Sequence, residues 1–152
     1  MKNNTRKSVP IRSFDQSLPM QLLKAREVAM SRFRPMLRKH QLTEQRWRVI
    51  RAIHEQGHID ASELAQKSFL LSPSLTRILK YLENEDIVKR EGDVKDLRRS
   101  VFSLTKKGKQ IIAKVAPETE LIYKRIEHIF GREEFDEILS LLEDFSKKIS
   151  KT

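Results

Sequence analysis

The amino-acid sequence predicts a mainly α-helical protein with one small β-hairpin. Apolar residues recur at three- and four-residue spacing along most of the chain, which is the spacing of one helix face. Only 4 glycines and 5 prolines interrupt the 152 residues, and this favours long helices over a turn-rich all-β fold. Two short β-prone runs, residues 87–91 and 100–104, flank a polar loop and predict the hairpin.

The N-terminal part of the chain divides into an arm and a helix. Residues 1–16 carry basic side chains among Asn, Ser, Thr and Pro and offer little to bury, so we expect a flexible basic arm. The first helical pattern begins at Leu18 and runs through Met36. Pro35 lies inside this pattern and predicts a kink or a break near its end.

Two further helices are expected, each with a capping residue at its start. Thr43 is suited to cap the first of them, and Gly57 is suited to end it. Asp60 and Glu63 have the spacing of a capping box, which predicts that a short helix follows directly.

A fourth helix is expected to start at Ser72-Pro73, with the serine as cap and the proline as first helical residue. Its buried stripe comprises Leu75, Ile78, Leu79 and Leu82. After the hairpin, Thr105 caps a long helix that Pro117 is expected to bend and Gly131 to end. An amphipathic helix then closes the chain.

This order contains a short helix-turn-helix followed by a two-stranded hairpin, which is the arrangement of a winged helix-turn-helix unit. We place that unit at residues 41–104. The flanking segments, residues 17–40 and 105–150, carry apolar stripes that so small a unit cannot cover. Exposed stripes of that extent mark an interface, so we expect a helical dimerisation region, and a two-fold dimer also suits a palindromic DNA site.

The composition favours a polyanionic partner. The formal net charge is +10, and the surplus falls in residues 1–51 and 72–109, while the rest of the chain is mildly acidic. Cations placed on phosphates release condensed counterions, which drives binding to nucleic acid. A soluble basic protein with no special partner is the alternative.

Other features of the composition bear on location and chemistry. The chain has no cysteine, which excludes a disulfide framework and a thiolate nucleophile. No apolar run has the length of a membrane span, and the N-terminus lacks the apolar centre of a signal peptide. A cytoplasmic location without membrane attachment is therefore expected.

The helix that starts at Ser72 is the candidate DNA-reading element. With its apolar stripe facing inward, the other side carries residue types that hydrogen-bond base edges and phosphates. Arg77 is the strongest candidate for a base contact, and the hydroxyls near the helix N-terminus suit phosphates. An ordinary solvated helix face is the alternative. The predicted DNA-binding residues of this helix are Ser72, Ser74, Thr76, Arg77, Lys80 and Tyr81.

The tip of the predicted hairpin supplies a second DNA-binding surface. Asp96 stands two residues before Arg98, and its carboxylate can hold that guanidinium and aim it outward. An arginine held in this way suits the narrow minor groove of DNA. In the alternative, Asp96 and Arg98 form a purely structural ion pair on the surface, which would contribute less than ~1 kcal/mol to stability. Lys95 and Arg99 are assigned to the same surface.

The hairpin region resembles the wing and helix-start signature of the MarR family of bacterial regulators. The residues that carry this resemblance are Asp96-Leu97-Arg98-Arg99 and residues 101–108. The resemblance covers nearly the whole chain. It is closest to a subgroup that represses operons for degrading homoprotocatechuate and 4-hydroxyphenylacetate, and it rests there on residues 17–27, 31–38, 42–49 and 69–79.

The resemblance implies a homodimeric repressor that binds a pseudo-palindromic operator and is released by a phenolic carboxylate. The family usually binds this ligand between the dimerisation helices and the reading domain. Arginines beside an aromatic ring suit such a ligand, because the cation pairs with the acid and the ring stacks. In the alternative interpretation, the aromatic residues belong to the core and the arginines are solvated or contact DNA. The candidate ligand-binding residues are Ser31, Arg34, His40, Arg46 and Trp47.

Enzymatic functions are disfavoured, because the sequence has no glycine-rich phosphate loop, no G-x-S-x-G motif and no cysteine. Residues 54–58 do fit the letters H-E-x-x-H, but Gly57 is expected to end the helix between His54 and His58, and no third ligand is clustered nearby. We therefore predict no enzyme, no cofactor and no metal site. The alternatives are a non-specific architectural DNA-binding protein, and a metal-responsive regulator or metal-dependent hydrolase at these histidines.

Overall fold

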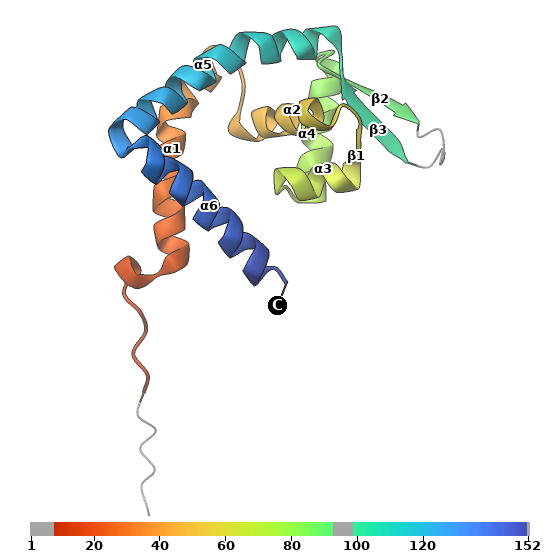
Figure 1. Ribbon diagram of the computed structural model, residues 1–152. Helices are drawn as coiled ribbons and strands as arrows, with labels where there is room; N and C mark the ends of the chain where they lie inside the picture. Colours follow the sequence, from red (N-terminus) through yellow and green to blue (C-terminus); the bar gives the residue numbers. More distant parts are fainter. Residues whose placement is uncertain (1–7, 93–98, 152) are drawn as a thin grey trace, which may run out of the picture.

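The computed structural model describes residues 8–92 and 99–151 of the chain. Its strands are β1 (Ile59–Asp60), β2 (Val88–Gly92) and β3 (Ser100–Leu104). Its helices are a 3-10 turn η1 (Phe14–Gln16), followed by α1 (Leu18–Lys39), α2 (Glu44–Gln56), α3 (Ala61–Ser68), α4 (Ser72–Asn84), α5 (Lys106–Phe130) and α6 (Arg132–Ile149). The predicted fold class, mainly helical with a winged helix-turn-helix order, is confirmed (Figure 1).

Local capping signals explain where most helices begin. Thr43, Asp60 and Thr105 each accept a hydrogen bond from the backbone N–H three residues further on, at 3.1, 2.9 and 3.1 Å. At α4 the cap lies one residue earlier than expected: Leu71 holds the cap position, and Ser72 is the first helical residue. The predicted caps are thus confirmed except at α4.

The two helices with an internal proline are continuous. α1 runs through Pro35 to Lys39, so of the predicted kink or break near that proline, the break does not occur. α5 likewise runs through Pro117 to Phe130 before Gly131 ends it. Continuity of α1 matters for the site, because its C-terminal part packs against the winged unit.

The sheet has the strand order β1-β3-β2, and both pairs are antiparallel. Val88 pairs with Leu104 in the hairpin, and Ile59 pairs with Phe102 on the other edge of β3. The sequence predicted the hairpin but missed β1, because a two-residue strand has no alternation to detect. β1 ties the start of α3 to the wing.

The core lies where α2, α3 and α4 meet the sheet. Its fully buried members include Ile50, Ile53, Leu64, Leu82 and Phe102. The C-terminal end of α1 joins the same core through Met36 and Leu37. α6, in contrast, has no buried residue in the single chain.

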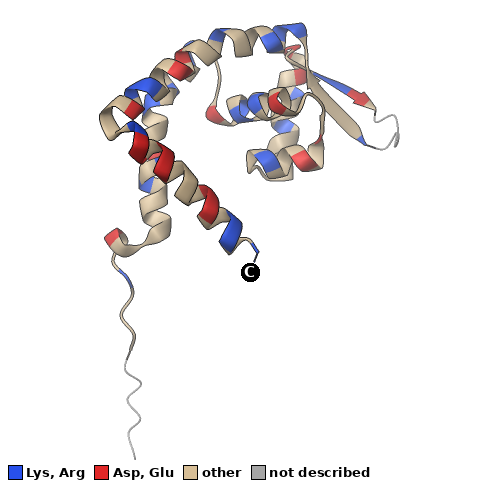
Figure 2. Ribbon diagram, viewed as in Figure 1, with Lys and Arg blue, Asp and Glu red and all other residues tan. Residues whose placement is uncertain are grey.

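The remaining helices extend away from the winged unit. In Figure 1, α5 leads from the sheet to the far end of the molecule, and α6 turns back there beside α1. Figure 2 shows acidic residues along α6 and basic residues on the winged unit. Leu18 and Leu22 of α1 face Ile138, Leu142 and Phe145 of α6 across an apolar hollow.

Candidate functional site

The first candidate surface is the outer face of α4. Leu75, Leu79 and Leu82 are buried, as the sequence predicted, and this orients the rest of the helix outward. Of the predicted DNA-binding residues, Ser74 and Tyr81 are half-buried; the exposed ones are Ser72, Thr76, Arg77 and Lys80. The structure therefore presents hydroxyls and cations together on one helix face.

Tyr81 has a partner from another helix. The guanidinium carbon of Arg46 on α2 lies 3.4 Å from the centre of the Tyr81 ring, which is a cation–π contact. Both residues are half-buried. The contact joins the start of α2 to the candidate reading helix.

At the wing, the structure describes one of the four predicted residues. Arg99 forms an ion pair with Asp60, the cap of α3. The hydrogen bond from the backbone of Glu63, together with the Arg99 cation, lowers the pKa of Asp60. Lys95, Asp96 and Arg98 lie outside the described residues. The wing base is thus fastened to the helix-turn-helix by a charge pair.

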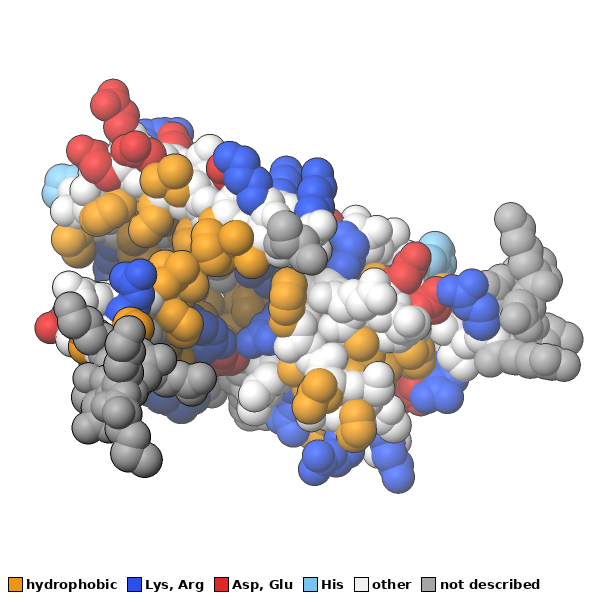
Figure 3. Space-filling view, turned by 90° about the horizontal axis from the view of Figure 1, so that it is seen from below, with side chains coloured by type: hydrophobic (Ala, Val, Ile, Leu, Met, Phe, Trp, Pro, Cys, Tyr) orange, Lys and Arg blue, Asp and Glu red, His pale blue; other side chains and the backbone are white. Residues whose placement is uncertain are grey.

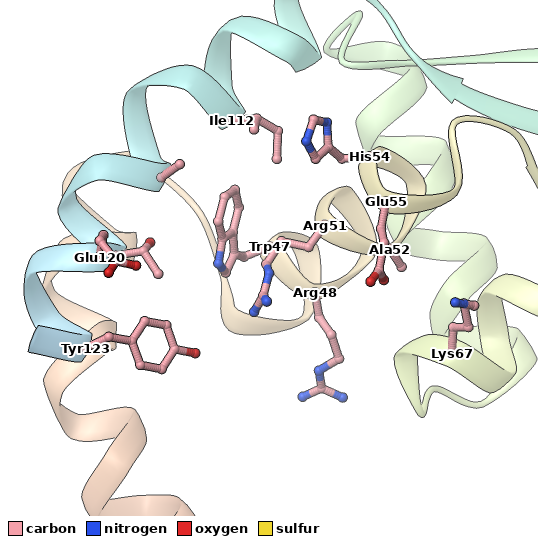
Figure 4. Close-up of a pocket in the computed structure, with 12 residues that line it drawn as sticks. Trp47, Arg48, Arg51, Ala52, His54, Glu55, Lys67, Ile112, Glu120 and Tyr123 are labelled. Carbon is pink, nitrogen blue, oxygen red and sulfur yellow. The ribbon is translucent and has the colours of Figure 1, made fainter. Parts of the chain in front are cut away.

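The second candidate site is an open pocket of about 820 Å³ between α2, α3 and α5. Figure 4 shows the Trp47 indole and the Tyr123 phenol pointing into it from opposite sides, with Arg48 and Arg51 between them and α3. The remaining lining residues are Ala52, His54, Glu55, Lys67, Ile112, Ala116, Thr119 and Glu120. Aromatic walls with nearby cations suit a small aromatic anion.

Of the five predicted ligand-binding residues, the structure places Trp47 on this pocket. The other four have contacts elsewhere. The Ser31 hydroxyl donates to the carbonyl of Val28, and Arg46 stacks on Tyr81. The structure therefore gathers around Trp47 a different set of neighbours from the one expected.

Arg34 and His40 pair with carboxylates. Arg34 donates to Glu27 at 2.9 Å, and this bond lowers the pKa of Glu27. His40 Nε2 lies 2.8 Å from Glu118, and the same bond lowers the pKa of Glu118. His40 thus holds the end of α1 to α5, whereas the Arg34–Glu27 pair lies within α1 and Arg34 reaches α2 through its bond of 3.3 Å to Glu44.

Sequence reasoning missed the two pocket arginines and the α5 side of the pocket. Arg51 follows Trp47 by four residues, and that spacing places both on one helix face, so it was a usable signal. Tyr123 and Thr119 gave no local signal, because their place on the pocket depends on how α5 crosses α2.

A carboxylate at the start of α2 connects the two parts of the molecule. Glu44 accepts hydrogen bonds from Arg26 and Arg34 of α1, and it also contacts Arg48 of α2. Its side chain is only 17% exposed. The extended helices are therefore joined to the winged unit by a partly buried charge cluster.

The metal alternative gains no support. His54 lies in the last turn of α2, and Gly57, with φ 74°, ends the helix before His58. Within residues 8–92 and 99–151, no group of three or more His, Cys, Asp or Glu side chains is arranged to hold a metal ion. In the same ranges, no helix has both the length and the apolarity that crossing a membrane requires.

A helix-turn-helix with a wing, a basic outer face and extended helices with uncovered apolar faces define a DNA-binding regulator of the winged-helix class. A sequence description of the MarR family matches residues 42–100. The homoprotocatechuate degradative operon repressor of Escherichia coli is 40% identical over 129 residues, which cover 85% of this chain and 87% of the relative. The chain belongs to the MarR family, and it is a transcriptional regulator rather than an enzyme.

Two further relatives agree. The transcriptional regulator FarR of Neisseria gonorrhoeae is 36% identical over 139 residues, covering 91% of this chain and 95% of the relative. The crystal structure of NadR in complex with 4-hydroxyphenylacetate has a TM-score of 0.80 and 36% identity, covering 91% of this chain and 99% of that one. The family resemblance read from the sequence is confirmed.

Proposed function

We propose that the protein is a cytoplasmic, homodimeric repressor of an operon for aromatic-acid breakdown, which a phenolic carboxylate releases from a pseudo-palindromic operator. The observation that carries the proposal is the pocket between α2 and α5, which Trp47 and Tyr123 line together with Arg48 and Arg51. The names of two relatives, one a repressor of homoprotocatechuate degradation and one solved with 4-hydroxyphenylacetate, support this class of ligand.

In this proposal, residues 41–104 bind DNA. The exposed Arg77 contacts a base edge in the major groove, and the hydroxyls of Ser72 and Thr76 at the start of α4 meet phosphates. The wing, with Lys95, Asp96, Arg98 and Arg99, enters the adjoining minor groove. The net charge of +10 supports this interface.

Residues 17–40 and 105–150 hold two copies together. α6 is amphipathic and has no fully buried residue in the single chain, with Leu141 60% and Leu139 53% exposed. Figure 3 shows apolar side chains gathered around a hollow on the side where α1 and α6 lie. A second copy of the chain, with the same stripes, is the partner that covers such a surface.

The ligand acts by population shift. A phenolic carboxylate pairs with the pocket arginines and stacks on the aromatic rings. Because the pocket lies between α5 and the winged unit, a bound ligand favours one placement of that unit relative to its two-fold partner. The operator affinity then falls to the extent that the ligand binds this placement more tightly than the placement that fits DNA.

The proposal is tested with the full chain and a duplex that the protein selects from a random-sequence pool. Calorimetry measures binding of 4-hydroxyphenylacetate and 3,4-dihydroxyphenylacetate, and fluorescence anisotropy measures operator affinity with and without each acid. Binding of either acid with a loss of operator affinity is the expected result. No heat and no change in DNA affinity with either acid would remove the phenolic-acid function.

The same duplex separates the second candidate function. A non-specific architectural protein, which the net charge alone would also fit, binds selected and scrambled duplexes equally well. The proposed repressor prefers the selected duplex by about 10³-fold or more.

A further inference from the structure

One side chain on the pocket also touches the turn of the helix-turn-helix. Nη1 of Arg48 donates a hydrogen bond of 2.9 Å to the backbone carbonyl of Ser68. Ser68 is the last residue of α3, and the candidate reading helix α4 begins at Ser72. Arg48 also lines the pocket, where Figure 4 shows its guanidinium extended into the open space below Trp47. A single cation thus joins the pocket to the segment that positions α4.

The turn that Arg48 contacts combines buried and exposed residues: Ser68 is fully buried, and its hydroxyl donates to the carbonyl of Leu64. The side chain of Phe69 is 89% exposed, and that of Leu71 is 79% exposed. Phe69 also adopts a left-handed backbone conformation, with φ 51°, which is costly for a residue other than glycine. Leu70 is half-buried and its N–H bonds to the carbonyl of Ala65. The Arg48 bond adds a contact from α2 to the internal hydrogen bonds that hold this turn.

The charge of Arg48 is incompletely compensated. Its carboxylate partner, Glu44, lies 3.4 Å from Nη2 but also serves Arg26 and Arg34. Burial, followed by repulsion from Arg26, lowers the pKa of Arg48. A second anion that entered the pocket would relieve this imbalance.

We propose that Arg48 is the positioning residue that transmits ligand binding to the reading helix: a carboxylate in the pocket draws its guanidinium away from the Ser68 carbonyl and so releases the turn before α4. This inference rests on the proposed function. The exchange is favourable because the Ser68 carbonyl is neutral, whereas a carboxylate brings a full negative charge to the guanidinium and can accept two parallel N–H bonds from it. Once the turn loses this bond, α4 is held less firmly in the orientation that fits the groove.

Hydrogen exchange of the wild-type dimer gives the decisive measurement. The N–H of Leu70 reports on the turn, because its bond to Ala65 forms only while the turn keeps its shape. Saturating 4-hydroxyphenylacetate is expected to speed the exchange of this amide while the core amides of α2, such as that of Ile50, stay protected. A turn that exchanges equally fast with and without the acid, when the acid does lower operator affinity, would overturn the role of Arg48 and leave the proposed function standing.

Three variants test the assignment to Arg48 without any ligand. Arg48→Met removes the bond to Ser68, so its Leu70 amide is expected to exchange at the rate of the ligand-bound wild type, with weaker operator binding. Arg51→Met is the matched control: it removes a cation from the same pocket and the same helix, and its turn is expected to keep the exchange rate of the ligand-free wild type. Arg48→Lys, which keeps the charge, is expected to lie between wild type and Arg48→Met.

The outcomes separate the two proposals. Saturating acid is expected to weaken operator binding of the wild type by about 5- to 150-fold, the usual range of coupling between sites. Equal turn exchange in Arg48→Met and wild type overturns the inference alone. No calorimetric binding of the acid to wild type overturns the proposed function and this inference with it.

Discussion

Replacing Arg77 with alanine isolates the base contact that we assign to α4. The side chain is exposed and lies opposite the buried leucines of the helix, so its loss leaves the core intact. The free energy of unfolding is expected to change by less than about 0.5 kcal/mol. A lost arginine–guanine contact costs on the order of 1–3 kcal/mol, which is about 5- to 150-fold in affinity per half-site. In a two-fold complex this free-energy cost applies at both half-sites.

Fluorescence anisotropy with the selected duplex measures this change, and Arg125→Ala provides the control. Arg125 is an exposed arginine of α5 outside the winged unit, so its replacement removes the same charge without touching α4. Arg77→Ala is expected to weaken operator binding far more than Arg125→Ala and to relax specificity at one base pair per half-site. Equal losses in the two variants would show that Arg77 contributes only its charge, and the assignment of α4 as reading helix would fail.

Three further predictions concern the dimer, the ligand pocket and the wing base. Leu141→Glu is expected to convert the dimer to monomer in sedimentation equilibrium, because an unpaired charge in an interface is costly. Leu141 is 60% exposed in the single chain, so helicity measured by circular dichroism is expected to be retained. A variant that remains dimeric at micromolar concentration contradicts this interface. Tyr123→Phe keeps the ring, whose centre lies 5.0 Å from that of Phe33, and removes the hydroxyl that faces the pocket. Calorimetry is expected to show about 2- to 10-fold weaker binding of 4-hydroxyphenylacetate, with unchanged thermal stability. Unchanged affinity for the acid would place the ligand away from α5. Because folding lowers the pKa of Asp60, the ionised Asp60 side chain stabilises the fold above the ordinary Asp pKa, and this stabilisation is lost as pH falls through the lowered value. In urea unfolding, Asp60→Asn is therefore expected to be less stable than wild type at pH 7 and to lose less stability on acidification to about pH 3. Equal losses of stability in the two proteins would exclude this contribution.

Local sequence signals predicted the helices better than the site. Thr43 and Thr105 cap the helices that they were expected to cap, because an N-cap depends only on a side chain and the backbone three residues on. The break predicted near Pro35 does not occur. A proline inside a helix removes one hydrogen bond, but the packing of Met36 and Leu37 into the core holds the last turns of α1 in place.

The pocket was harder to predict because its walls come from segments far apart in the chain. Trp47 was recognised, yet Arg34, chosen as its neighbour, faces Glu27, which lies seven residues earlier on the same side of α1. Tyr123 reaches the pocket only because α5 extends from the wing back across α2. No spacing within the sequence encodes that crossing, so the pocket residues of α5 required the folded structure.

The position of α2 explains how so small a protein could couple a ligand to DNA. Trp47 and Arg51 place one face of this helix on the pocket, Arg46 contacts Tyr81 of the reading helix, and Glu44 at its start is held by arginines of α1. α2 is also packed into the core, where close-packed side chains transmit a displacement rather than absorb it. A ligand that moves α2 relative to α5 must therefore change the position of α4 or break the Glu44 cluster. Since that cluster is only partly buried and shares one carboxylate among several cations that include Arg48, we expect it to loosen together with the turn before α4, while the core of the winged unit stays packed.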